Sequence, residues 1–197
     1  MQALPPAPQA IGIFDTFIAR QTETLIVDEK LMSLSGDSFD VKLATGAPLL
    51  KVKGSSLSLR GRKQVTDMAN NHLFTITQKL LSLHSTFIVE DPSGRSIMEV
   101  KSSLTTLIGS KATITFTSKS GKQEVLVMKG NWRSSKADIV DESTGFVVAT
   151  IKRDRSVKHY LGGQQTYTVT VAPGVDMALV VAMCVCMDEK NNEPSSG

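Results

Sequence analysis

The chain has 197 residues, enough for one ordinary domain with a substantial core. Its 22 Lys and Arg residues nearly balance 19 Asp and Glu residues, and the formal net charge is +3. An excess this small, without a basic arm or an acidic tail, predicts no direct nucleic-acid partner. Residues 1–9 lack the basic and apolar regions of a secretory signal peptide, so none is expected.

The two cysteines, Cys184 and Cys186, are two positions apart, which places them on nearly opposite sides of a helix. We interpret both as reduced, buried, small apolar groups. A C-x-C metal pair is the alternative, but no other Cys or His lies near in sequence to complete it. The cysteines and the missing signal peptide predict an intracellular, cytoplasmic protein, with the membrane periphery and the nucleus as further locations to test.

Composition sets the expected domain boundaries. Residues 1–10 form a Pro-rich lead, which we expect to be disordered. Residues 190–197 contain Asn, Pro and Ser and are expected to form a disordered tail. Residues 11–189 then make up a single domain that includes a helix at about 175–188.

Most of this domain reads as short strands separated by turns. In 166–171, Tyr167, Val169 and Val171 alternate with three threonines, which is typical of a strand with one buried face. Asp91-Pro92-Ser93-Gly94 fits a type I turn, and Asn70-Asn71 suits a tight hairpin. Strands are expected at 14–20, 24–28, 39–43, 48–52, 63–68, 74–77, 86–90, 96–100, 112–117, 124–128, 136–141, 146–152 and 166–171. One segment, 102–110, instead fits a short helix at an end of the domain.

The stretch from Met177 to Met187 contains no charged or amide side chain, so a helix here is apolar on every side. At about 1.5 Å per residue the helix spans roughly 20 Å, short of the roughly 30 Å of bilayer hydrocarbon. It is therefore expected to be a buried core helix, and a C-terminal membrane anchor is the alternative. Asp176 is expected to cap its N-terminus, and Asp188 and Glu189 to mark where it reaches water.

The strands and the helix together predict a mainly β fold. Strand–turn–strand spacing without intervening helices favours an antiparallel meander. Eight-stranded barrels are filled by side chains, whereas a barrel of about twelve strands has room for a helix. Eleven-stranded cans with a central helix set the precedent. We therefore predict a closed antiparallel barrel of about twelve strands that encloses the hydrophobic C-terminal helix.

Three stretches carry a family likeness: VAPGVD (171–176), KLLSLH (79–84) and VKSSL (100–104). With the apolar helix that follows VAPGVD, they resemble the LURP-one-related family of tubby C-terminal-like proteins, over about residues 14–188. Phe87 stands where the family usually has Trp. The resemblance implies a closed twelve-stranded barrel threaded by the C-terminal helix. It also implies kinship with tubby, whose domain binds phosphoinositides, with phospholipid scramblases, and with plant proteins associated with pathogen defence.

Catalytic motifs are missing from the sequence. There is no P-loop, G-x-G-x-x-G, G-x-S-x-G or H-E-x-x-H sequence, and His72, His84 and His159 are scattered. His84 is interpreted as a hydrogen-bonded structural residue. No catalytic residue, metal site or cofactor is predicted. The acidic calcium-loop-like segment and the cysteine cluster of scramblases are also lacking, which argues against calcium-driven lipid scrambling.

Two basic clusters are the remaining functional candidates. The first, which we prefer, comprises Lys51, Lys53, Arg60, Arg62 and Lys63. The second comprises Lys152, Arg153, Arg155 and Lys158. Cations beside flexible Gly and Ser backbone suit a phosphate headgroup, and ordinary solvated barrel surface is the alternative.

The leading hypothesis is a non-enzymatic, soluble binding or membrane-tethering module for acidic phospholipids such as phosphoinositides, peripheral to the membrane and linked to stress or defence signalling. If the helix fills the barrel, no cavity is left for an acyl chain, and the ligand binds the outer wall or the rim. The alternative is a protein-interaction scaffold that binds no lipid. The resemblance leaves protein partners unnamed.

Overall fold

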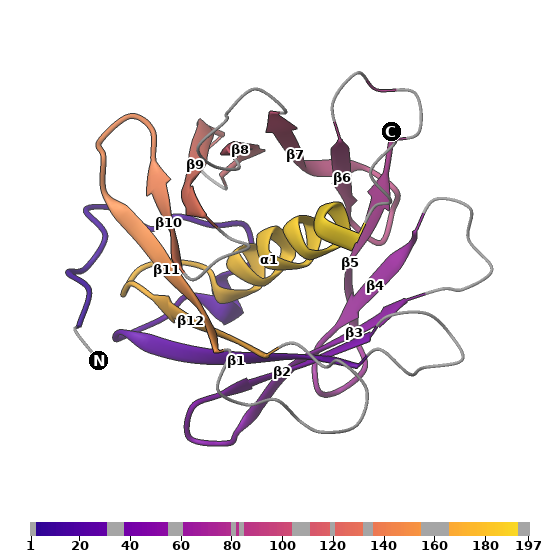
Figure 1. Cartoon of the computed structure of the whole chain (residues 1–197), viewed down its shortest axis with the longest axis horizontal. Coiled ribbons are helices and arrows are strands. Elements are labelled where there is room, and N and C mark those ends of the chain that lie inside the picture. Colours follow the sequence, from indigo (N-terminus) through magenta and orange to yellow (C-terminus); the bar gives the residue numbers. More distant parts are fainter. Residues whose placement is uncertain are drawn as a thin grey trace.

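The computed structural model describes residues 3–30, 38–54, 61–79, 82, 85–103, 111–118, 121–131, 136–154 and 166–192. These residues form a closed barrel of twelve strands, one α-helix and one short 3₁₀ helix, η1 (Figure 1). In chain order the elements are η1 (Asp15–Phe17), β1 (Glu23–Lys30), β2 (Ser38–Leu43), β3 (Pro48–Gly54), β4 (Lys63–Thr66), β5 (His72–Gln78), β6 (Thr86–Glu90), β7 (Ser96–Ser103), β8 (Lys111–Thr117), β9 (Gln123–Asn131), β10 (Lys136–Asp141), β11 (Val147–Asp154), β12 (Thr166–Val171) and α1 (Met177–Asn192).

Each strand pairs antiparallel with its neighbours in sequence, and β1 closes the barrel on β12 with Glu23 opposite Val171. The predicted bounds of β6, β10 and β12 agree with the structure, and the other strands differ by a few residues. The turn residues also behave as predicted, since Asn70 adopts a φ of 63° and Gly94 donates its N–H to Asp91 O at 2.9 Å. Most of the predicted helix at 102–110 lies outside the described residues, and its first two residues end β7.

Alternation along the strands fills the barrel with apolar side chains. In β12, Tyr167, Val169 and Val171 are buried, while the intervening threonines are half-buried on the outer wall. This is the expected outcome for a sheet with one dry face. The inner face of the whole barrel follows the same pattern and packs on α1 as one core.

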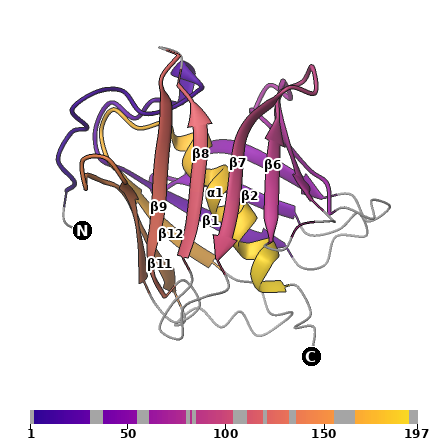
Figure 2. The same ribbon diagram turned by 90° about the horizontal axis from the view of Figure 1, so that it is seen from above.

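Helix α1 occupies the centre of the barrel, as two perpendicular views show (Figures 1 and 2). Every residue from Met177 to Asp188 is buried. An apolar surface on all sides needs partners on all sides, and the ring of strands supplies them. The helix is thus a core element and not a membrane anchor. It continues to Asn192, past the predicted end at 188 and into the segment predicted as tail.

The N-terminal segment differs from both expectations made for it. Residues 3–10 were expected to be disordered, but Leu4 and Thr22 exchange hydrogen bonds of 3.2 and 3.1 Å, and Ala7 donates its N–H to Pro173 O at 2.8 Å. Residues 14–20 were expected to form a strand, but they contain η1 and one isolated bridge, Ile18 to Asp176. Phe17 and Ala19 are buried, so this segment covers one end of the barrel.

The barrel therefore has two different ends. At one, which we call the capped end, the N-terminal segment meets the start of α1. At the other, which we call the distal end, α1 finishes between the first residues of β4 and β12. Figure 2 shows the N-terminal segment and the start of α1 toward the top and the last turn of α1 at the bottom.

Candidate functional site

The VAPGVD segment is tied to the N-terminal segment through its backbone. The bonds run from Ala7 N to Pro173 O (2.8 Å), Ile11 N to Gly174 O (3.0 Å), Ala19 N to Val175 O (2.8 Å), Gly174 N to Ala19 O (2.7 Å) and Asp176 N to Ile11 O (2.9 Å). Gly174 has a φ of 85°, in the left-handed region that favours glycine. The motif that carries the family likeness thus has a structural role at the capped end.

Asp176 is the centre of this arrangement and is fully buried. Its Oδ1 accepts hydrogen bonds from the N–H groups of Ala178 (2.9 Å) and Leu179 (3.2 Å), as predicted for a helix cap. Its Oδ2 accepts from the N–H groups of Ile13 (2.9 Å) and Phe14 (2.7 Å). Burial raises the pKa of Asp176, while the four N–H donors act in the opposite direction. All the acceptor capacity of the carboxylate goes into holding the fold, which leaves none for a ligand.

Lys63, predicted to be a surface cation of the first basic cluster, lies inside the barrel wall. Its side chain is 3% exposed, its Nζ is 2.8 Å from Glu189 Oε1, and it lies 5.2 Å from the centre of the Phe39 ring. Lys63 is in phase with the buried Val65 along β4, so it faces inward. It is therefore a structural partner of α1 and not an available headgroup ligand.

The predicted emergence of α1 at Asp188 and Glu189 is also corrected. Asp188 is buried and accepts a hydrogen bond from the hydroxyl of Tyr167 at 2.5 Å. The side chain of Glu189 is 19% exposed and pairs with Lys63. Carboxylates near a helix C-terminus oppose the helix dipole. Here the Tyr167 hydroxyl on β12 donates to Asp188 and the Lys63 ammonium group on β4 pairs with Glu189, which stabilises both negative charges near the end of α1.

Three members of the first cluster remain on the outer wall, and we call Lys51, Lys53 and Arg62 the β3–β4 cluster. Lys53 and Arg62 are exposed, and Lys51 is half-buried with its Nζ 3.5 Å from Asn70 Oδ1. The register places Lys53 opposite Gln64, two residues along the chain from Arg62. Arg60 lies outside the described residues. The cluster offers two ammonium groups and one guanidinium group, a donor set that suits phosphate oxygens.

The second cluster is represented by Lys152, which is exposed on β11. Arg153 is the next residue of the same strand, and Arg155 and Lys158 lie outside the described residues. The register adds a cation that the sequence alone did not group with it, because Lys152 lies directly opposite Lys136 on β10. Lys136 Nζ is also 3.5 Å from Asp138 Oδ2.

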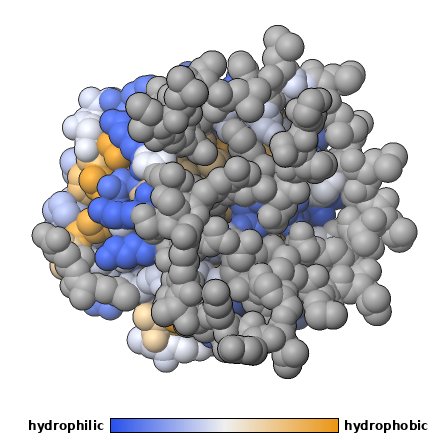
Figure 3. Space-filling model, in the orientation of Figure 1, coloured by the Kyte–Doolittle hydropathy of each residue, from blue (hydrophilic) through white to orange (hydrophobic). Residues whose placement is uncertain are grey.

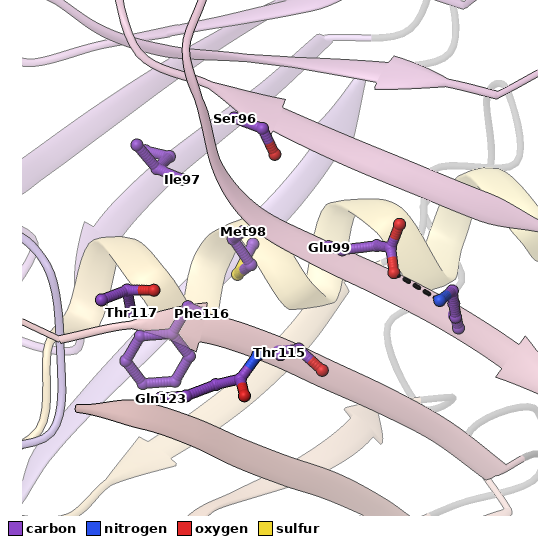
Figure 4. Close-up of a pocket in the computed structure, with 9 residues that line it drawn as sticks. Ser96, Ile97, Met98, Glu99, Thr115, Phe116, Thr117 and Gln123 are labelled. Atoms are coloured by element: carbon purple, nitrogen blue, oxygen red, sulfur yellow. Dashed lines mark ion pairs between the residues drawn. The ribbon is translucent and has the colours of Figure 1, made fainter. Parts of the chain in front are cut away.

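An open groove of about 400 Å³ crosses the outer wall over β7 and β8. Figure 4 shows Ile97, Glu99, Thr115 and Gln123 around it, and two further lining residues, Met98 and Phe116, are buried in the core. Its one carboxylate, Glu99, is paired with Lys101 at 2.6 Å. Sequence reasoning did not find this groove, because no motif marks it. Its lining residues contain no nucleophile–base pair.

Among the residues that the structure describes, no group of three or more His, Cys, Asp or Glu side chains could hold a metal ion. His72 Nε2 is 2.9 Å from Thr75 Oγ1, and His84 and His159 lie outside the described residues. In the same part of the chain, every helix is too short or too polar to cross a membrane. Where residues are coloured in Figure 3, orange apolar areas are small and interspersed with blue hydrophilic ones.

The family model described as LURP-one-related matches residues 23–188. The chain belongs to the LURP-one-related family. The match starts with β1 and ends within α1, so it covers the whole barrel and most of the central helix.

Family members with curated names resemble the chain over nearly their full length. The chain is 23% identical over 202 residues to "Protein LURP-one-related 15" of Arabidopsis thaliana, covering 95% of this chain and 90% of that protein. It is 25% identical over 186 residues to "Protein LURP-one-related 10" of the same plant, covering 91% and 95%.

A crystal structure of a protein from Arabidopsis thaliana has the same fold, with a TM-score of 0.60 and 17% identity, covering 93% of this chain and 99% of that one. The predicted family and the predicted fold of a closed barrel around a C-terminal helix are thereby confirmed.

Proposed function

We propose that this LURP-one-related protein is a non-enzymatic module that binds acidic phospholipid headgroups, phosphoinositides foremost, and so associates peripherally with membranes. The observation that supports this most directly is the β3–β4 cluster. It places the exposed cations Lys53 and Arg62 on one outer surface, beside the half-buried Lys51. Each Lys or Arg near an anionic membrane surface contributes about 1 kcal/mol to binding.

The filled interior of the barrel also supports a binding site on the outer wall. Helix α1 packs against every inner strand face as one core, and its buried surface is continuous from Met177 to Asp188. A ligand that had to insert an acyl chain would have to displace this helix. A headgroup that contacts side chains on the wall needs no such displacement. The proposed link to stress or defence signalling stays a prediction from the family resemblance.

Vesicle co-sedimentation tests this function. The protein is mixed at physiological salt with neutral phosphatidylcholine vesicles and with vesicles that also contain a phosphoinositide. We expect recovery with the second set only. A Lys51→Gln, Lys53→Gln, Arg62→Gln variant is expected to bind on the order of 100-fold more weakly, at about fivefold per cation.

The matched control carries Arg20→Gln, Arg95→Gln and Lys122→Gln, three cations of the capped end that are all exposed. It removes the same net charge and is expected to bind as the unmodified protein does. Equal recovery of the unmodified protein with both kinds of vesicle would contradict the proposal. If the protein binds no vesicles but a protein partner is recovered with it from native lysate in a constant molar ratio, the result would instead support the interaction scaffold.

A further inference from the structure

The two ends of the barrel carry opposite charge, which no single cluster reveals. At the distal end, exposed cations lie within two residues of the ends of seven strands. In the described part of the chain these are Lys53, Arg62, Lys79, Lys101, Lys129, Lys136 and Lys152. We call these seven residues the distal rim. Among the residues whose side chains the structure describes, the carboxylates at this end are Asp28, Asp40, Asp138, Asp188 and Glu189, and the seven exposed cations outnumber them.

The capped end is acidic by the same criterion. Its described carboxylates, counted with the N-terminal segment and the start of α1, are Asp15, Glu23, Asp67, Glu90, Asp91, Glu124, Asp141, Glu142 and Asp176. Its described cations are Arg20, Lys42, Arg95 and Lys122. The chain is therefore nearly neutral as a whole but electrically asymmetric along the barrel axis, and such a field orients a molecule at a charged surface.

We infer that the distal rim as a whole is the docking surface and that its partner is the anionic face of a lipid bilayer, which the barrel meets end-on. This inference rests on the proposed function and extends it, because the β3–β4 cluster becomes one sector of a larger ring. Lys53 and Arg62 belong to that cluster, while Lys129, Lys136 and Lys152 lie on β9, β10 and β11.

The shape of the rim favours a flat partner. Because the barrel is closed, the strand ends at one end of it surround the axis, and the rim cations are spread around that circle. A plane of headgroups can contact all of them together. A nucleic-acid duplex touches such a ring only along one line, which leaves most of the cations unused.

Two local details agree with an anionic partner. Lys136 and Lys152 lie directly opposite each other on neighbouring strands, and like charges in that position destabilise a sheet. Asp138, 3.5 Å from Lys136 Nζ, offsets part of this repulsion, and an anionic surface relieves the remainder. The two carboxylates near the end of α1 lie inward of the rim, where Asp188 is buried and accepts from Tyr167 and Glu189 pairs with the buried Lys63.

The first test neutralises rim positions outside the β3–β4 cluster. In a Lys79→Gln, Lys129→Gln, Lys152→Gln variant, affinity for vesicles of phosphatidylcholine with phosphatidylserine is expected to fall on the order of 100-fold. The capped-end triple variant described above removes the same charge and is expected to keep its affinity. If the rim variant binds unchanged while the β3–β4 variant is impaired, the inference is wrong and the proposed function stands. If the unmodified protein binds no anionic vesicle, the proposed function fails.

The second test measures orientation and needs no loss of binding. Gln64→Cys, beside the distal rim, and Gln123→Cys, at the capped end, are both exposed positions for a fluorophore. Vesicles that carry a headgroup quencher are expected to quench the label at position 64 much more than the label at position 123. Equal quenching, or the reverse order, would overturn end-on docking. Binding to duplex DNA as tight as binding to the vesicles, at the same salt, would overturn the choice of partner.

Discussion

Gly12 lies against Asp176 so closely that no side chain fits between them. A Cβ at position 12 would be 2.2 Å from Asp176 Cβ. We predict that Gly12→Ala lowers the free energy of unfolding by about 3 kcal/mol, because the added carbon pushes the carboxylate off its four N–H donors. Urea denaturation measures this. Gly46→Ala is the control, since that glycine has a φ of 90° in open space and its replacement is expected to cost only about 1–2 kcal/mol. Equal costs for both would contradict the predicted clash.

Asp141 makes the fold sensitive to acid. Burial alone would raise the pKa of this carboxyl, but hydrogen bonds from Ser143 and Thr144 together lower it below the ordinary value of 3.8. The folded state therefore binds its proton less readily than the unfolded chain does. The resulting stabilisation is present above pH 3.8 and is lost as the pH falls through the lower, folded-state pKa. In Asp141→Asn, unfolding free energy measured from pH 6 to pH 2.5 is expected to fall less than in the unmodified protein. An equally steep decline in both would assign the acid sensitivity to other carboxylates.

Single residues show what can be predicted from the sequence and what cannot. The cap at Asp176 was predictable because it follows Pro173-Gly174 and precedes an apolar run. Lys63 was assigned to the surface because of its neighbours in sequence, although its phase with Val65 places it on the inner face. The partner that makes its burial tolerable, Glu189, is far away in the chain and carries no local signal.

At the scale of elements, α1 is fixed to the barrel wall by the pair between Lys63 and Glu189. Glu189→Gln leaves the buried ammonium group without its anion, and we predict a loss of about 2–3 kcal/mol of stability. Lys63→Met leaves a carboxylate that water can partly reach, so its cost is expected to be smaller. The double variant is expected to be close to the unmodified protein, because no charge remains uncompensated. Additive losses in the double-mutant cycle would show that the two side chains are not coupled.

The strands were predictable because alternation is a local pattern with a direct physical cause. The segment 14–20 shows where the pattern misleads. Its buried Phe17 and Ala19 are two apart, as in a strand, but they arise from η1 and the extended residues after it. The order of the Pro-rich lead was not predictable either. Its contacts are with Thr22 and with Pro173, and Pro173 is far away in the chain.

At the scale of the whole molecule, the two cysteines of α1 report on opening of the barrel. Burial raises the pKa of Cys184 to about 12, and the pKa of Cys186 is raised by burial as well. Reactive thiolate is therefore scarce in the folded protein. We predict that iodoacetamide at pH 8 modifies neither thiol in the native protein and both thiols in about 8 M urea, where the protein is unfolded. Mass spectrometry counts the modified thiols. Rapid native labelling would show that α1 leaves the barrel without global unfolding.

The seam between β1 and β12 governs when the fold can form. Thr166 on β12 donates a hydrogen bond to Asp28 on β1 across 138 residues of chain. During synthesis the apolar inner face of β1 stays uncovered until nearly all the other strands have been made, because α1, which covers that face, follows β12 in the chain. Contacts over such separations form slowly and leave apolar strands open to aggregation meanwhile. The barrel can therefore close only once β12 and α1 have been made, and not when any one hairpin is complete.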